Sequence, residues 1–272
     1  MSKMLPYPVF DFHTHCFPDA IAPKTVAYLG EKASLRYHHD GTYAGLCEYE
    51  RDADGFLVLP IATKPSQTRS ILQFAASIDG DGKARSLGSV HPHDPDYESW
   101  LDVVVATGLA GIKLHPEYQD FAIDDDSLWT FYEAVFARNL LLVLHAGDDL
   151  GFDDSSQSAP ERIARLCDRF PDSRIVAAHM GGFNQWEHVS RCLAGRPNLW
   201  LDCSFGADRM PGDQFSALAW AHGLDHILFG TDAPWASLGD TAEAVLRAGF
   251  AQDELRGIFY GNAAKLLGME DH

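Results

Sequence analysis

Cationic side chains are scarce in this sequence. Its 272 residues include 21 Lys and Arg against 39 Asp and Glu, which gives a formal net charge of −18 at pH 7. Nucleic acids and anionic membrane surfaces bind proteins through clustered Lys and Arg, so we expect neither as a partner. The deficit says little about small-molecule substrates, which we do expect, and it leaves a homo-oligomer open.

Long apolar runs and paired cysteines are also missing. No run approaches the roughly 20 apolar residues of a membrane span, and the first strand-like stretch starts too close to Met1 for a signal peptide. We therefore expect a cytoplasmic protein. Five cysteines without a C-x-x-C pair argue against a zinc ribbon and a disulfide framework. The sequence also lacks the G-x-S-x-G motif of serine hydrolases.

The sequence does contain a regular alternation of short apolar runs and amphipathic segments. The eight runs are VFDFHTH (9–15), GFLVLPIAT (55–63), SLGSVHP (86–92), AGIKLHP (110–116), LLLVLHAG (140–147), RIVAAHMGG (174–182), LWLDCS (199–204) and HILFGTDAP (226–234). Runs this apolar suit parallel strands that are buried on both faces. Between them, segments such as 127–139 carry apolar residues at helical spacing.

Eight such units in about 250 residues predict a (β/α)8 TIM barrel, because an open doubly wound sheet usually has fewer strands and often a glycine-rich phosphate loop after the first. We expect one domain over residues 1–272, with an insertion at about 20–55 over the barrel mouth. The segment QDELRGIFYGNAAKLLG should form helices that close the outer layer.

Histidines and one aspartate recur at the ends of these runs. His13 and His15 are two apart, so a strand would project both imidazoles to one face. Taken alone, the pair could be two surface histidines. However, His91, His115, His145, His179 and Asp232 close later runs, and in a TIM barrel the chemistry lies where strands meet the following loops. This register predicts His13, His15, His145 and Asp232 as ligands of one divalent ion, most simply Zn²⁺.

The pieces FDFHTH, PIATKPSQ, GSVHPHD, GIKLHP, LLVLHAG, IVAAHMGG, LWLDCS, LFGTDAPW and GNAAKLLG resemble the amidohydrolase superfamily, within it the amidohydrolase 2 branch of aminocarboxymuconate-semialdehyde decarboxylase-like proteins. The resemblance implies metal dependence and the same four ligands. It gives His179 two alternative roles, in a second metal site or as a group that polarises substrate or bound water. It likewise leaves Lys113 either carboxylated between two metals or a free ammonium, the form we favour because His115 points to the same face.

The chemistry expected of such a site is activation of water. A divalent ion lowers the pKa of bound water toward about 7, Asp232 can accept the proton, and His179 can stabilise an oxyanion. The leading hypothesis is a metal-dependent hydrolase of a C–N, C–O or lactone bond. A non-oxidative decarboxylase of aromatic or unsaturated carboxylates would use the same ligands, and a non-catalytic metal- or ligand-binding barrel is the third reading.

Several further residues could contact a substrate. Lys113, His115 and Trp235 are the candidates for the pocket wall. Lys64, Arg69 and Arg209 could hold an anionic substrate, although a surface cation is the simpler interpretation of each. The loop GDDLGFDDSSQ carries four aspartates without the spacing of an EF-hand, so we expect a solvated acidic lid.

Overall fold

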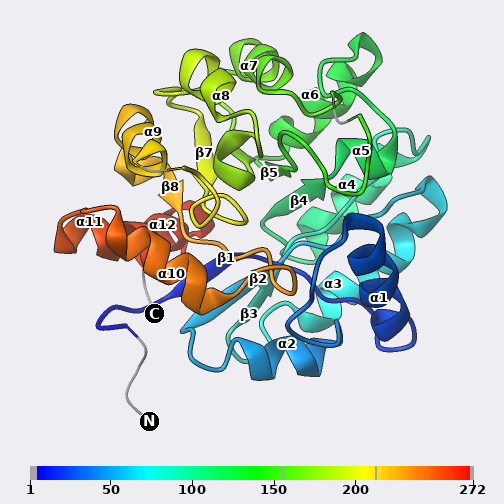
Figure 1. Cartoon of the computed structure of the whole chain (residues 1–272). Helices are drawn as coiled ribbons and strands as arrows, with labels where there is room; N and C mark the ends of the chain where they lie inside the picture. Colours follow the sequence, from blue (N-terminus) through cyan, green and yellow to red (C-terminus); the bar gives the residue numbers. More distant parts are fainter. Residues whose placement is uncertain (1–4, 155, 212, 270–272) are drawn as a thin grey trace.

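The computed structural model of the chain describes residues 5–154, 156–211 and 213–269. Seven of the eight apolar runs contain a strand, whereas the third run, 86–92, shares only Ser86 with the strand that it follows. The strands are β1 (Phe10–Thr14), β2 (Gly55–Val58), β3 (Ala84–Ser86), β4 (Gly111–Leu114), β5 (Leu141–Leu144), β6 (Ile175–Ala177), β7 (Leu199–Asp202) and β8 (Ile227–Leu228). They pair in parallel in chain order, as β1-β2-β3 and as β4 to β8. Figure 1 shows them at the centre of the molecule with helices around them.

Two seams join these groups into a ring. Gly88 bridges to Ile112 between β3 and β4, and Thr14 bridges to Ala233 between β1 and the segment after β8. At the second seam the Phe12 amide donates to the Phe229 carbonyl over 2.8 Å, and the Asp232 amide donates to the His13 carbonyl over 2.8 Å. The predicted TIM barrel is confirmed.

The helices follow the strands along the chain. They are α1 (Ala22–Ala33), α2 (Tyr43–Tyr49), α3 (Thr68–Ile78), α4 (Tyr97–Ala106), α5 (Pro116–Gln119), α6 (Trp129–Ala137), α7 (Pro160–Arg169), α8 (Trp186–Cys192), α9 (Gln214–His222), α10 (Leu238–Arg247), α11 (Gln252–Arg256) and α12 (Asn262–Leu267). α1 and α2 occupy the stretch interpreted as an insertion (Figure 1). That a single domain carries this insertion stays a prediction.

The described residues form three clusters of buried apolar side chains, the smallest of which includes Leu46, Phe56 and Val58. Leu57, Val143 and Val176 belong to a cluster inside the barrel, whereas Ile112 and Leu142 pack in a larger cluster with the helices. Ala263 and Leu266 of α12 join the inner cluster. The C-terminal segment forms helices, as expected, and these two side chains pack it against residues of the strands.

Two expectations from composition can be compared with the structure. Each of the five cysteines lies within the described residues and has a free thiol. None of the helices in the described parts of the chain is long and apolar enough to cross a membrane.

Candidate metal centre

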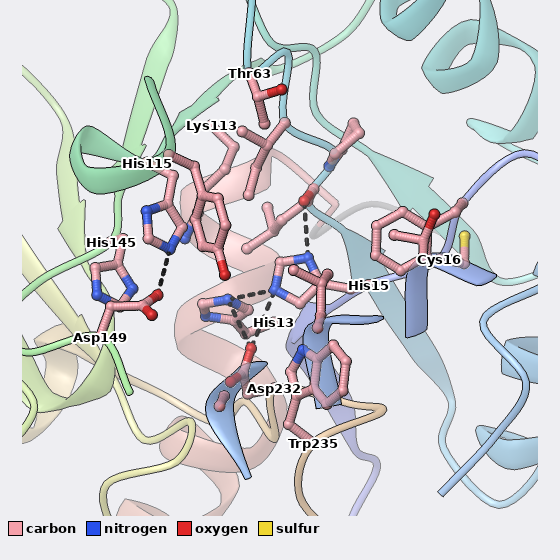
Figure 2. Close-up of a pocket in the computed structure, with 18 of the residues that line it drawn as sticks. His13, His15, Cys16, Thr63, Lys113, His115, His145, Asp149, Asp232 and Trp235 are labelled. Carbon is pink, nitrogen blue, oxygen red and sulfur yellow. Dashed lines mark hydrogen bonds and ion pairs between the residues drawn. The ribbon is translucent and has the colours of Figure 1, made fainter. Parts of the chain in front are cut away.

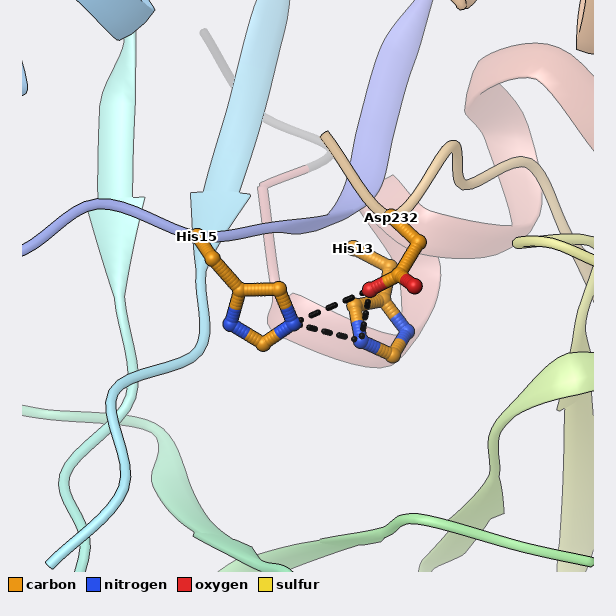
Figure 3. A group of neighbouring side chains, drawn as sticks. All are labelled: His13, His15 and Asp232. Atoms are coloured by element: carbon orange, nitrogen blue, oxygen red, sulfur yellow. Dashed lines mark hydrogen bonds and ion pairs between the residues drawn. The ribbon is translucent and has the colours of Figure 1, made fainter. Parts of the chain in front are cut away.

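Three donor atoms converge at the seam between β1 and β8. His13 Nε2 and His15 Nε2 are 3.2 Å apart, and Asp232 Oδ1 lies 3.4 Å from the first and 3.0 Å from the second (Figure 3). Ligand atoms about 2.0–2.1 Å from a tetrahedral zinc ion are themselves about 3.4 Å apart. The spacing of these three atoms therefore fits one divalent cation between them.

The protons of both imidazoles lie on the other ring nitrogens. His15 Nδ1 is 2.9 Å from the Leu59 carbonyl oxygen, which can only accept, so Nδ1 carries the proton. His13 Nδ1 donates in the same way to Asp202 Oδ2 over 2.9 Å. When the rings are neutral, two lone pairs and a carboxylate oxygen face one another, and a cation between them would relieve their repulsion.

Asp202, the last residue of β7, and Ser204, two residues later, hold His13 in this orientation through hydrogen bonds. Asp202 Oδ1 accepts hydrogen bonds from the Ser204 hydroxyl, the Ser204 amide and the His179 amide, so the carboxylate that orients His13 is itself held. A carboxylate behind a ligating histidine fixes its tautomer and raises its basicity. Sequence reasoning assigned neither residue a role, although both lie at a strand end in LWLDCS.

A break in regular pairing positions His13. β1 pairs with β2 at Asp11↔Phe56, but the register shifts before Thr14↔Val58. The buried Asp11 carboxylate accepts hydrogen bonds from the His13 amide and from the Thr231 amide and hydroxyl. Asp11 thus ties the irregular part of β1 to the residue before Asp232.

Two further backbone features bring Asp232 and His13 together. A Cβ at Gly230 would lie 2.9 Å from the His13 Cβ, so a glycine allows the chain after β8 to approach. Asp232 has φ +75° and His179 has φ +57°, in the left-handed region that non-glycine residues seldom adopt. Such strained conformations concentrate at functional sites.

His179 and His145 lie beside the three donors. His179 Nδ1 donates to the Ser204 carbonyl over 2.9 Å, and its Nε2 is 3.1 Å from His145 Nδ1. A neutral His179 therefore presents a lone pair rather than a proton, and stabilising an oxyanion would require its doubly protonated form. His145 lies outside the group formed by His13, His15 and Asp232, so its role as a fourth ligand stays a prediction.

His145 belongs to a second group with His115 and Asp149 (Figure 2). Its ring stacks on that of His115, with 4.0 Å between centroids and 10° between planes. An imidazole binds a metal in the plane of its ring, and two planes that are nearly parallel at this separation do not meet near either ring. The second group therefore does not fit one ion with both rings as they lie. Instead His115 Nε2 pairs with Asp149 Oδ2 at 3.2 Å.

Burial and charge set the protonation of these groups. Burial, with neighbouring cationic groups, lowers the pKa of His13, His115 and His145 well below the usual value. Burial alone would raise the pKa of Asp232, but interaction with His15 and with the other nearby imidazoles in their protonated forms outweighs it, and the pKa is lowered. Burial lowers the pKa of Lys113 to about 8, against the opposing charges of Asp202 and Asp232.

The group of three opens into a cavity of about 610 Å³. Lys113, His115, His145 and Trp235 line it (Figure 2). His179 is also part of its wall. Among the described residues, Lys64, Arg69 and Arg209 are not part of its wall. Asp148 and Asp149 do line it, whereas Asp153 and Asp154 are exposed, so only half of the acidic loop matches the solvated lid that we expected.

Glu117, whose Oε2 lies 3.7 Å from His115 Nδ1, should make the stability of the folded protein depend on pH. Its Oε1 accepts hydrogen bonds from the Ser158 hydroxyl and amide, and burial raises its pKa from 4.5 to about 7. The folded protein thus favours the protonated carboxyl, and the associated stability is lost as pH rises from about 4.5 through 7.

We expect Glu117→Gln, which keeps the oxygen but cannot ionise, to gain about 1–3 kcal/mol in free energy of unfolding relative to wild type between pH 5 and pH 8. Denaturant unfolding at both pH values measures this, with Glu98→Gln on the exposed surface of α4 as the control. A difference between Glu117→Gln and wild type that did not change with pH would contradict the assignment.

The chain has relatives among known proteins. Residues 11–269 match the family described as amidohydrolase. The chain belongs to this family. No curated protein sequence matches it.

Solved structures of proteins with low sequence identity to this chain share its fold. One is 5-carboxyvanillate decarboxylase of Sphingomonas paucimobilis, at 17% identity and TM-score 0.68, over 96% of this chain and 99% of that one. Another is dihydroxybenzoic acid decarboxylase of Polaromonas sp. JS666 with bound manganese and 2-nitroresorcinol, at 16%, TM-score 0.70 and 98% of each chain. A candidate 2-pyrone-4,6-dicarboxylic acid hydrolase of Pseudomonas putida matches at 16%, TM-score 0.66, over 98% and 100%.

Proposed function

We propose that this amidohydrolase is a metal-dependent hydrolase that cleaves a C–N, C–O or lactone bond of a small-molecule substrate. The observation that carries the proposal is the convergence of His13 Nε2, His15 Nε2 and Asp232 Oδ1 within 3.4 Å of one another, at the base of a cavity large enough for a substrate. Zinc is our choice of ion because two imidazoles and a carboxylate suit it.

A bound divalent cation would supply a water of lowered pKa and would polarise a carbonyl oxygen. Asp232 would act as the proton acceptor. Its Oδ1 faces the two imidazoles, which leaves the second oxygen to take a proton from water and return it to the leaving group. The lowered pKa of Asp232 keeps it ionised, as a general base must be at neutral pH.

Lys113 is our candidate for holding the carbonyl oxygen of the substrate. Its Nζ is buried, lines the cavity and has no hydrogen-bond partner among the described residues. An ammonium in this position can donate to developing negative charge, a stabilisation that is strongest where water is excluded. His179 could contribute only when protonated on both nitrogens, and otherwise would accept from His145 Nδ1.

Metal removal and product analysis test the function. We expect zinc-loaded protein to hydrolyse members of a panel of aryl esters, anilides and lactones, and chelator-treated protein to lose this activity until zinc is restored. Release of titratable acid in a pH-stat reports hydrolysis. Equal activity after removal of the metal would contradict the proposal.

Decarboxylation is the second candidate. Lys113 beside the metal ligands could orient a substrate carboxylate as readily as a carbonyl, and two of the similar structures are named as decarboxylases. The same protein samples, offered aromatic carboxylates, would then release carbon dioxide without any gain of acid from esters or lactones. A metal-binding barrel without catalysis would give neither product.

A further inference from the structure

The cavity is polar at its deep end and apolar along its walls. The buried His13, Lys113 and Asp232 lie at the deep end. Most of the remaining wall is aromatic or aliphatic, and it comes from α1 and the segment before it, from the segment after β2, from α3 and from the loops after β6, β7 and β8. Examples are Phe17, Leu29, Ile61, Phe74, Phe205 and Trp235.

The mouth of the cavity is also apolar. Ile21, Tyr28 and Leu150 line it with side chains that remain 51%, 63% and 44% exposed. Exposed large apolar side chains that gather around one opening mark a binding surface rather than ordinary exterior. An apolar body that fills the cavity would cover them.

Cations are nearly absent from this wall. Among the described residues that line it, Lys113 and Lys24 are the lysines and no arginine contributes, and the histidines of the lining are those already described around the two donor groups. Lys113 is buried at the deep end, whereas Lys24 is exposed to solvent on α1. Asp148 and Asp149 also line the outer part, so its formal charge is negative.

A second acid group that lies away from the deep end would therefore find no buried lysine or arginine among the described residues. A carboxylate that leaves water for an apolar wall carries a large desolvation cost unless a cation or several donors compensate for it. A lone exposed lysine offers little compensation, because water screens its charge.

We propose that the cavity selects substrates with a large apolar or aromatic body and at most one acid group, which lies at the deep end, and that it rejects dicarboxylates. The assignment of the deep end rests on the function proposed above. The proposed rejection of dicarboxylates would distinguish this protein from the similar Pseudomonas putida structure, which is named for a dicarboxylic acid.

A matched pair of ligands tests the proposal by binding alone. Calorimetry would compare biphenyl-4-carboxylate with biphenyl-4,4′-dicarboxylate on zinc-loaded protein at fixed ionic strength. We expect the dicarboxylate to bind at least roughly 10-fold more weakly, since its distal carboxylate must be desolvated against an apolar, acidic wall. The size control, 4′-methylbiphenyl-4-carboxylate, should bind within about 3-fold of the monocarboxylate.

A charge placed at the mouth should reverse the selection. Leu150→Lys adds a cation where the distal carboxylate would lie, and we expect it to raise the ratio of dicarboxylate to monocarboxylate affinity about 3- to 10-fold. Leu246→Lys is the matched control, because Leu246 is 39% exposed on α10 and is not part of the cavity wall.

The outcomes separate this proposal from the proposed function. Equal or tighter binding of the dicarboxylate by wild type, or no binding of the monocarboxylate, would overturn the selectivity. Selective binding of the monocarboxylate by a protein that hydrolyses no ester, amide or lactone would overturn only the hydrolase assignment.

Discussion

Asp232→Asn is expected to lower the turnover rate by a factor on the order of 10²–10⁴, the range typical for loss of a general acid-base group. The asparagine keeps an oxygen that can face His13 and His15 but cannot accept the proton from water. The backbone should tolerate the change, because Asp232 has φ +75° and asparagine is among the residues that best adopt this conformation. Metal content should fall only partially, and the change in substrate affinity should be small.

Steady-state kinetics on metal-loaded Asp232→Asn, with metal content measured on the same sample, check this expectation. Asp253→Asn, at an exposed position of α11, controls for the loss of one carboxylate. Turnover within a few-fold of wild type would show that Asp232 is not the proton acceptor, and His179 would be the next residue to change.

His13→Ala is expected to remove most of the bound metal. It deletes one of the three convergent donors and leaves the buried Asp202 carboxylate without the ring N–H that it accepts. Both changes weaken metal binding, because the Asp202 carboxylate orients the His13 ring that would coordinate the ion. Elemental analysis of purified protein, and competition with a chelator, measure the effect.

His145→Ala is the informative companion to this variant. We expect it to retain more metal than His13→Ala, since its ring lies outside the group of three and stacks on His115. His188→Ala, on the exposed surface of α8, should retain all of it. Full metal content in His13→Ala would rule out the proposed centre, and equal loss in His13→Ala and His145→Ala would favour four ligands.

The sequence predicted the parts of this molecule that follow from periodicity. Eight apolar runs closed by glycine, proline or polar residues correspond to eight strands, because strands buried on both faces need continuous apolar sequence. His13, His15 and Asp232 could be grouped from their positions in the sequence, since the carboxyl ends of barrel strands meet at one face.

Other features depend on tertiary detail that periodicity does not carry. Strict alternation would place Asp11 on the same face as His13. The pairing of β1 is irregular after Asp11, however, and the Asp11 carboxylate accepts a hydrogen bond from the Thr231 amide instead of joining the donor group. The ring orientation of His145 depends on its contacts with His115 and His179. The role of Asp202 could not be predicted, because its hydrogen bond to His13 joins residues 189 positions apart and no pattern in the neighbouring sequence indicates it.

The seam between β1 and β8 also determines when the site can exist. His15 and Asp232 are separated by 217 positions, and the hydrogen bonds that align them join the first strand to the segment after the last. During synthesis the chain emerges from its N-terminus, so His13 and His15 are available long before their carboxylate partner. An incomplete chain that ends before β8 has two of the three donors and an open barrel. The three donors can therefore come together only after the last strand has been synthesised and has paired with β1. Metal binding by a nascent chain would then indicate that the barrel has closed.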